Sequence, residues 1–222
     1  MDLNYYLEAA RINLGVTSRT ADGEYDGEVD ENKPQVAVSK DEIKDLAVYN
    51  YLRCVNYLYI NKDREFESVE WLRGFLEKVA GMLNHSLTDS DKLYRDFECA
   101  HREGYHDYGS KLENLEKDLD TFYSWYFVVI DNELREDEAY DLCAMTEKIF
   151  DRDIHPLADG CGRFSKLLST YILMRNDFQL KRIEDRKEYY DVMDPVVREY
   201  NGMFNPLNSK NFIEYYKSLE KI

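Results

Sequence analysis

The sequence predicts a mainly α fold in a single domain, with one small β element. Apolar residues recur at helical spacing through most of the chain after residue 39. Hydrophobic residues make up 44% of the 222 positions, which is enough for a packed core. Residues 84–110 differ, because they are rich in turn residues and alternate only weakly. They predict a short hairpin around residues 102–104.

The helices are expected in the following order. A short helix at residues 2–13 places Tyr6 and two alanines on one face. Ser39 stands three residues before Glu42, which is the spacing of a capping box, and it predicts the start of a long helix. Further helices are expected at residues 68–83, 111–131, 138–150, from about 162 onward, 179–192, 195–200 and 209–219.

The chain divides into two parts. Residues 1–38 are expected to form an N-terminal helix followed by an acidic loop or arm, and residues 39–222 the helical domain, with 138–175 at its centre. Residues 14–37 hold three glycines and many acids and show no sustained period. A solvated linker is the plainer interpretation of this segment, and a regulatory tail is the more specific one.

Charge and cysteine content narrow the possible partners. A formal net charge of −16 repels phosphate backbones and anionic membranes, so we expect neither nucleic acid nor a membrane as a partner. The four cysteines form no CxxC pair, which is typical of a reducing compartment. The N-terminal residues do not resemble a secretory signal, and no apolar stretch reaches the roughly 20 residues of a membrane helix. These features predict a cytoplasmic protein.

The segment HPLADGCGR, residues 155–163, is the most informative part of the sequence. It joins two predicted helices, and Pro156 cannot continue the first of them. Gly160 and Gly162 permit a tight turn and close approach of a ligand to the backbone. The next helix then presents free N–H groups and a positive dipole end, an arrangement that binds phosphate oxygens.

Side chains within and beside this loop add the chemistry of a phosphate site. Arg163 and, three residues later, Lys166 offer cations to phosphate. Asp159 is a candidate ligand for a divalent metal held against phosphates. A histidine imidazole ordinarily titrates near neutrality, so His155 is a candidate general base for an attacking hydroxyl.

The stretch HPLADGCGRFSK at residues 155–166 resembles the signature of the Fic family, His-Pro-Phe-x-Asp/Glu-Gly-Asn-Gly-Arg-x-x-Arg. RKEYY at residues 186–190 is similar to the Arg-x-x-Tyr-Tyr of that family's following helix. LYRDFECAHREGYHDY at residues 93–108 lies where the family carries a β-hairpin flap that holds the target segment. The resemblance covers about residues 68–195 and implies a Fic-like helical bundle with a small β-hairpin flap.

The resemblance also implies an activity, the transfer of AMP from ATP to a Ser, Thr or Tyr hydroxyl of a target protein. In such a nucleotidyltransferase His155 would deprotonate the hydroxyl, and Asp159 would bind Mg²⁺ bridging the phosphates. The backbone of Gly160, Cys161 and Gly162 would form the anion hole, and Arg163 and Lys166 would contact the outer phosphates. The partners implied are ATP with Mg²⁺ and the target protein.

Three positions depart from the family pattern. Leu157 replaces Phe, Cys161 replaces Asn and so lacks an amide donor, and Lys166 replaces the second Arg and lacks its fork geometry. The related Doc group, which transfers phosphate, carries Lys where Gly162 stands, so Gly162 favours nucleotidyl transfer. Two alternatives stay open: a catalytically weak or inactive binding module, and transfer of UMP, phosphocholine or phosphate.

Two further points concern regulation and the role of single cysteine and histidine residues. The nearest match to the family's inhibitory helix, residues 20–24, falls in the acidic segment, so self-inhibition is not predicted. A separate inhibitory protein is kept as an alternative partner. Cys161 at a helix N-terminus is expected to have a lowered pKa, although a passive loop residue is the favoured interpretation. Zinc binding by Cys99, His101 and His106 is weighed against a polar hairpin, which is favoured.

Overall fold

The computed structural model describes residues 1–17, 40–87, 92–99, 109–193 and 206–222, and within these ranges it contains helices and no extended strand. The predicted mainly α class is therefore confirmed. The helices are α1 (Leu3–Thr17), α3 (Lys40–Ile60), α4 (Val69–Leu83), a 3₁₀ turn (Leu112–Asn114) leading into α5 (Leu115–Asp131), α6 (Glu136–Lys148), a π-helix (Ile149–Ile154), α7 (Cys161–Arg175), α8 (Arg186–Met193) and α9 (Pro206–Ser218).

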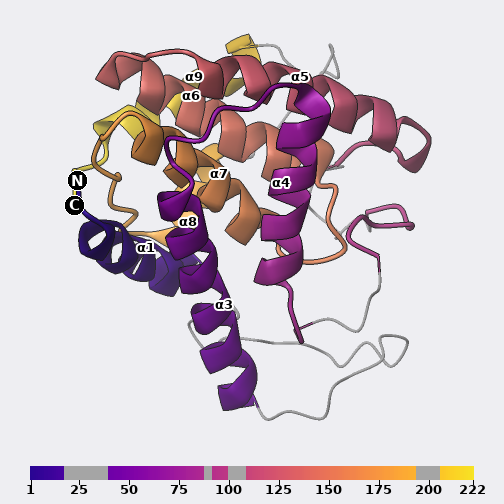
Figure 1. Cartoon of the computed structure of the whole chain (residues 1–222), viewed down its shortest axis with the longest axis horizontal. Helices are drawn as coiled ribbons and strands as arrows, with labels where there is room; N and C mark the ends of the chain where they lie inside the picture. Colours follow the sequence, from indigo (N-terminus) through magenta and orange to yellow (C-terminus); the bar gives the residue numbers. More distant parts are fainter. Residues whose placement is uncertain (18–39, 88–91, 100–108, 194–205) are drawn as a thin grey trace.

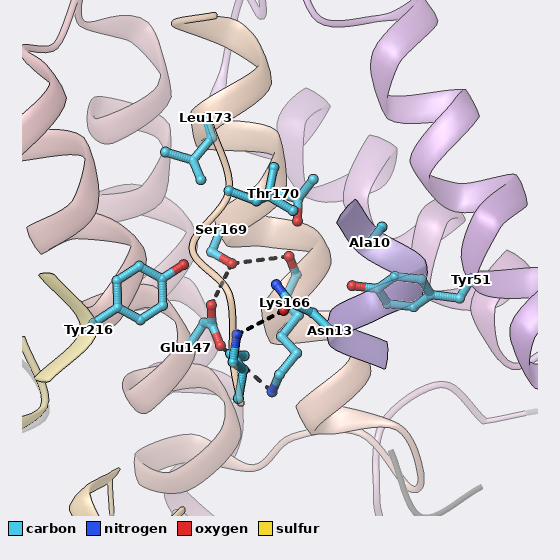
Figure 2. A pocket seen from close by; sticks show the side chains of 11 residues that line it. Ala10, Asn13, Tyr51, Glu147, Lys166, Ser169, Thr170, Leu173 and Tyr216 are labelled. Carbon is cyan, nitrogen blue, oxygen red and sulfur yellow. Dashed lines mark hydrogen bonds and ion pairs between the residues drawn. The ribbon is translucent and has the colours of Figure 1, made fainter. Parts of the chain in front are cut away.

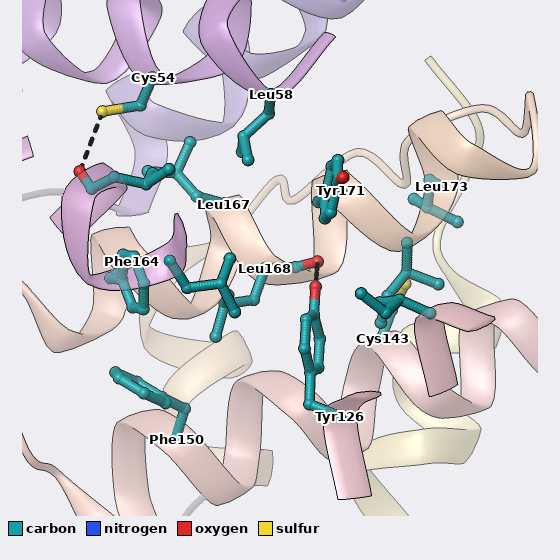
Figure 3. Packing of buried hydrophobic residues seen from close by; sticks show 14 of the residues in the cluster. Cys54, Leu58, Tyr126, Cys143, Phe150, Phe164, Leu167, Leu168, Tyr171 and Leu173 are labelled. Atoms are coloured by element: carbon teal, nitrogen blue, oxygen red, sulfur yellow. Dashed lines mark hydrogen bonds between the residues drawn. The ribbon is translucent and has the colours of Figure 1, made fainter. Parts of the chain in front are cut away.

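Helix α7 forms the centre of the molecule (Figure 1). All of its residues from 163 to 174 are buried, because α3, α5 and α6 pack around it. Figure 3 shows how side chains from several helices meet along it, with the rings of Phe150 and Phe164 5.1 Å apart. The Tyr126 hydroxyl donates to the Leu168 carbonyl at 2.8 Å, so this tyrosine is buried without leaving its hydroxyl unpaired. The motif loop leads directly into this rigid central helix.

Helix α1 packs against α3 and forms part of the same core, beside the end of the chain (Figure 1). It runs to Thr17, four residues beyond the predicted end. The reason is tertiary: Leu14 is buried, and the Asn13 amide donates to the Lys181 carbonyl while its oxygen accepts from the Ile183 N–H. A polar side chain bonded in this way holds the helix against the extended segment that follows α7.

The helix predicted at residues 179–192 is a second correction, because α8 begins only at Arg186. The residues before it are extended and pair with the end of the chain. Lys181 forms an antiparallel bridge with Lys221, and the Ile222 N–H donates to the Leu180 carbonyl at 3.0 Å. These long-range bonds replace the helical ones, which a local pattern does not reveal.

Other boundaries agree with the sequence within a few residues. Ser68 caps α4, since its Oγ accepts from the Trp71 N–H at 3.3 Å. The predicted hairpin at 102–104, the helix at 195–200 and most of the acidic arm lie outside the described residues. Within the predicted flap segment at residues 93–108, the structure describes residues 93–99. They contain one antiparallel bridge, between Tyr94 and Leu157. Among the described helices, none combines the length and apolarity that crossing a membrane requires.

Candidate active site

The helix before the motif ends in a π-helical turn that sets the conformation of His155. The His155 N–H donates to the Phe150 carbonyl, five residues back, at 3.0 Å. His155 itself has a left-handed backbone, with φ 47° and ψ 59°, and precedes a proline. A non-glycine residue in this region carries strain that only well-determined surroundings maintain, and such residues gather at functional sites.

The imidazole of His155 has a defined tautomer. Its Nδ1 lies 2.6 Å from the carbonyl oxygen of Asp151. Because a carbonyl oxygen only accepts hydrogen bonds, Nδ1 carries the proton, and the lone pair of the neutral ring is on Nε2. The side chain is 26% exposed, so it lies at the surface of the site rather than in the core.

The loop after His155 is held by the segment at residues 92–99. The Arg95 N–H donates to the Pro156 carbonyl at 2.9 Å, and the Ala158 N–H donates to the Leu93 carbonyl at 3.3 Å. Leu157 lies between these bonds and is buried, so a large apolar side chain anchors the loop where the family carries Phe.

Gly160 is the N-cap of α7, and its backbone conformation requires a glycine there. Its φ is 82°, and a Cβ at this position would lie 2.9 Å from Asn84 Oδ1. The Asn84 amide donates to the Asp159 carbonyl at 2.9 Å, which ties the end of α4 to the loop. The first turn of α7 therefore starts at a fixed place next to the loop. The first N–H groups of a helix have no acceptor within the helix.

Gly162 faces a polar group of side chains. A Cβ on Gly162 would lie 3.1 Å from the Tyr190 hydroxyl and 3.3 Å from Asp151 Oδ2. The guanidinium of Arg152 lies 4.7 Å from the centre of the Tyr190 ring. The glycine thus lets α8 and the π-helix approach the start of α7 closely.

Asp159 and Arg163 form an ion pair across one turn. Arg163 Nη2 donates to Asp159 Oδ2 at 3.0 Å, and the Asp159 side chain is 46% exposed while that of Arg163 is 7% exposed. Arg163 Nη1 is buried and finds no acceptor among the described residues. A buried donor without a partner is energetically costly.

Lys166 turns into a buried polar cluster, which we define as Glu147, Lys166, Ser169 and Tyr189. Figure 2 shows Lys166, Glu147 and Ser169 of this cluster pointing toward one another. Its Nζ lies 3.7 Å from Glu147 Oε2 and 3.4 Å from the Gly162 carbonyl. The Ser169 hydroxyl donates to Glu147 Oε1 at 2.7 Å, and the Tyr189 hydroxyl donates to Glu147 Oε2. Burial opposes the charge of Lys166, but Tyr190 and Glu147 raise the pKa of its ammonium overall. The phosphate contact of Lys166 remains a prediction.

Cys161 does not have the acidic thiol expected of a helix N-terminus. Burial, reinforced by the charge of Asp151, raises the pKa of the Cys161 thiol well above its usual value. Its Sγ accepts from the Leu157 N–H at 3.2 Å and donates to the Leu157 carbonyl at 3.5 Å. The side chain closes the loop internally, which agrees with the passive interpretation and contradicts the expectation of a lowered pKa.

The structure thus pairs Asp159 with Arg163 at the start of α7 and places His155 at the other end of the same loop. Of the three residues weighed as zinc ligands and judged more consistent with a polar hairpin, His101 and His106 lie outside the described residues. Across the described ranges no group of three or more His, Cys, Asp or Glu side chains could hold a metal on its own. Sequence reasoning missed Arg95 and the carbonyl of Asp151, because neither backbone acceptors nor contacts between distant segments leave a local sequence signal.

Comparisons with known proteins bear on the fold. No protein-family profile matches the chain, and no curated protein matches it in sequence. Among solved structures, it is similar to that of a Fic domain containing signaling protein from Bacteroides thetaiotaomicron, with a TM-score of 0.68 and 14% sequence identity. The match covers 97% of this chain and 85% of the other. The chain therefore has the fold of a Fic domain protein, as its motif implied.

Proposed function

We propose that the protein transfers AMP from ATP to a hydroxyl side chain of a target protein. The observation that carries this proposal is the imidazole of His155. It is held with Nδ1 protonated, at the loop that precedes the N-terminus of α7. A neutral histidine with its lone pair on Nε2 suits the removal of a hydroxyl proton, and a helix start suits phosphate.

The reaction would be a displacement at phosphorus. His155 Nε2 takes the proton of a Ser, Thr or Tyr hydroxyl while the oxygen forms a bond to the α-phosphorus of ATP. The bond between that phosphorus and the oxygen bridging to the β-phosphorus breaks, and pyrophosphate leaves. Backbone N–H groups at Gly160, Cys161 and Gly162 would stabilise the developing charge, as oxyanion donors do. Arg163 supplies the unpartnered Nη1 for an outer phosphate oxygen.

Mg²⁺ fits the residues present. Asp159 presents a half-exposed carboxylate whose Oδ2 is oriented by Arg163, and Mg²⁺ is commonly held by one or two carboxylates together with substrate phosphates and water. The metal would neutralise phosphate charge in the bound nucleotide. Asp159→Asn is expected to raise the Mg²⁺ concentration needed for half-maximal transfer by about tenfold. Asp177→Asn, at an exposed position beside Lys62, should leave it unchanged.

The test of the function uses ATP labelled on either the α- or the γ-phosphate, with cell-extract proteins as acceptors. We expect label from the α-phosphate and not from the γ-phosphate on protein. His155→Ala should abolish transfer, and the exposed His85→Ala should not. Intact-mass spectrometry of the modified acceptor separates AMP from UMP, phosphocholine and phosphate. If titration calorimetry detects no binding of ATP with Mg²⁺, the proposal is wrong.

A non-catalytic nucleotide-binding module is the second candidate, and one observation favours it. Lys166 pairs with Glu147 in the core, where an outward cation would have served the phosphates. ATP binding without transfer by the wild-type protein would support this candidate. Gain of transfer in Cys161→Asn would then show that the rest of the site is competent.

A further inference from the structure

A buried arginine outside the motif contacts the backbone on both sides of the candidate base. The Arg95 guanidinium is fully buried and donates to four carbonyls from three segments. Its Nε donates to the His155 carbonyl at 2.8 Å, and Nη2 lies 3.4 Å from the Ile154 carbonyl. Nη1 donates to the Phe97 carbonyl at 2.8 Å, and Nη2 also donates to the Ser110 carbonyl.

These bonds act on the strained residue of the site. The backbone N–H of His155 and its ring Nδ1 are both bonded within the π-helix, so they define one side of the residue. Its carbonyl points to Arg95 instead, and the direction of that carbonyl sets ψ of His155 and the plane of the peptide to Pro156. Without the bond from the Arg95 side chain, that peptide loses a restraint against rotation toward the extended conformation that residues before proline prefer.

The acceptors on the far side of Arg95 are themselves fixed. The Ser110 N–H donates to the Ile154 carbonyl at 3.0 Å, and the Ser110 hydroxyl donates to the buried carboxylate of Asp118. The Gly109 N–H donates to the Arg152 carbonyl at 2.8 Å. Arg95 therefore joins His155 to a rigid point on α5 rather than to a loose loop.

We infer that Arg95 is a positioning residue for the general base. It holds the His155–Pro156 peptide in the orientation that lets Nδ1 bond to the Asp151 carbonyl and leaves the lone pair on Nε2 toward the reacting hydroxyl. This inference rests on the proposed function for its catalytic consequence. Its structural content, a single imidazole tautomer maintained by Arg95, is independent of that function.

The variant is Arg95→Lys, which keeps the charge but replaces a planar five-donor fork by a compact ammonium that cannot reach the same four carbonyls. Arg175→Lys is the matched control, because the half-buried Arg175 also donates to several carbonyls and lies at the opposite end of α7 from the loop. Its Nε donates to Ile130 at 2.9 Å, and its Nη1 donates to Lys62 at 2.8 Å and Arg64 at 2.7 Å. Both variants are made in a Gly74→Ala background, because a Cβ there meets nothing within 4 Å and removes a helix glycine.

The first readout is the nitrogen spectrum of His155 by NMR, assigned with His155→Ala. The parent protein should show one tautomer, with Nδ1 protonated. Arg95→Lys should show a mixture of tautomers, while Arg175→Lys should keep the parent spectrum. If Arg95→Lys is folded and keeps the single tautomer, the inference is overturned. The measurement needs no substrate, so it stands whether or not the protein transfers AMP.

The second readout is steady-state transfer. Arg95→Lys should lower kcat by about 10²-fold, since small misplacements of a base have effects of that size. KM for ATP should change less than about threefold, and Arg175→Lys should also change kcat by less than about threefold. Equal losses of kcat in the two variants would point to general destabilisation and count against Arg95. Absence of transfer in the parent would overturn the proposed function and leave the NMR result to decide on Arg95.

Should Arg95→Lys not fold even in the Gly74→Ala background, Arg95→Gln is used with Arg175→Gln as its control. A glutamine amide can still donate to one of the carbonyls. The same tautomer mixture is expected in Arg95→Gln, and a single tautomer would again overturn the inference.

Discussion

Lys166 Nζ lies 3.7 Å from Glu147 Oε2 in the core between α6 and α7, and both side chains are more than nine-tenths buried. Removing one partner would strand the other charge away from water, so we expect Glu147→Ala to lower the free energy of unfolding by about 3–5 kcal/mol. Urea denaturation measures this loss. Asp191→Ala, which breaks the exposed pair with Lys187, should cost less than about 1 kcal/mol.

The paired substitution sharpens this prediction. Glu147→Gln with Lys166→Met leaves no buried charge at either position, so its cost should be clearly smaller than the sum of the two single changes. Strict additivity would mean that the two charges do not interact in the folded protein.

Gly160→Ala is expected to destabilise the protein by about 1–3 kcal/mol. The position has φ 82°, and the new Cβ would meet Asn84 Oδ1 at 2.9 Å, so backbone strain and crowding act together. Gly74→Ala is the control, because it lies within α4 with open space around it and should stabilise by up to about 1 kcal/mol. Thermal unfolding compares the stabilities of the two variants. An unchanged stability in Gly160→Ala would contradict the left-handed backbone of Gly160.

Cys161 is expected to resist alkylation in the native protein. Burial raises the pKa of its thiol, and the thiolate is the form that reacts with iodoacetamide. Cys99 is the half-buried member of the four cysteines, and it should react faster by on the order of 10²-fold. Peptide mapping after labelling identifies the sites, and labelling in urea should reach all four. Equal native rates at Cys161 and Cys99 would be inconsistent with the internal bonds of the loop.

Stability should fall above about pH 10. Burial, followed by the charge of Glu147, raises the pKa of Tyr189 and Tyr216 well above the usual value. Above pH 10 the unfolded chain loses these protons while the native state keeps them. The unfolded state then binds fewer protons, and stability declines by about 1.4 kcal/mol per pH unit for each tyrosine. Urea midpoints between pH 8 and 11 test this, and a constant midpoint would refute it.

Sequence reasoning succeeded where local signals determine the structure and failed where long-range contacts do. The stripes of α4 and α5 and the position of the motif between two helices follow from local signals: apolar spacing, the Ser68 cap, Pro156 and the glycines. The extended course of residues 179–185 depends on pairing with the end of the chain, which no local pattern encodes.

The same contrast between local signals and long-range contacts holds at the candidate site. Its loop and its histidine were recognisable, because their residue types carry the chemistry directly. Whether a side chain turns inward depends on its partners, and this decided the burial of Lys166 beside Glu147 and the raised pKa of Cys161. The bond from Arg95 to the His155 carbonyl was beyond prediction, because a backbone oxygen has no signature in the sequence.

The π-helix at Ile149–Ile154 has a consequence for comparing sequences. Its wider turn takes up more residues than an α-turn, so counting forward from α6 at 3.6 residues per turn assigns His155 to the wrong side of the helix. An alignment with a protein that lacks this turn needs a gap between the α6 core positions and the histidine, or one of the two is misregistered. The widened turn behaves as an insertion hidden inside a helix, and alignments at low identity should allow for it there.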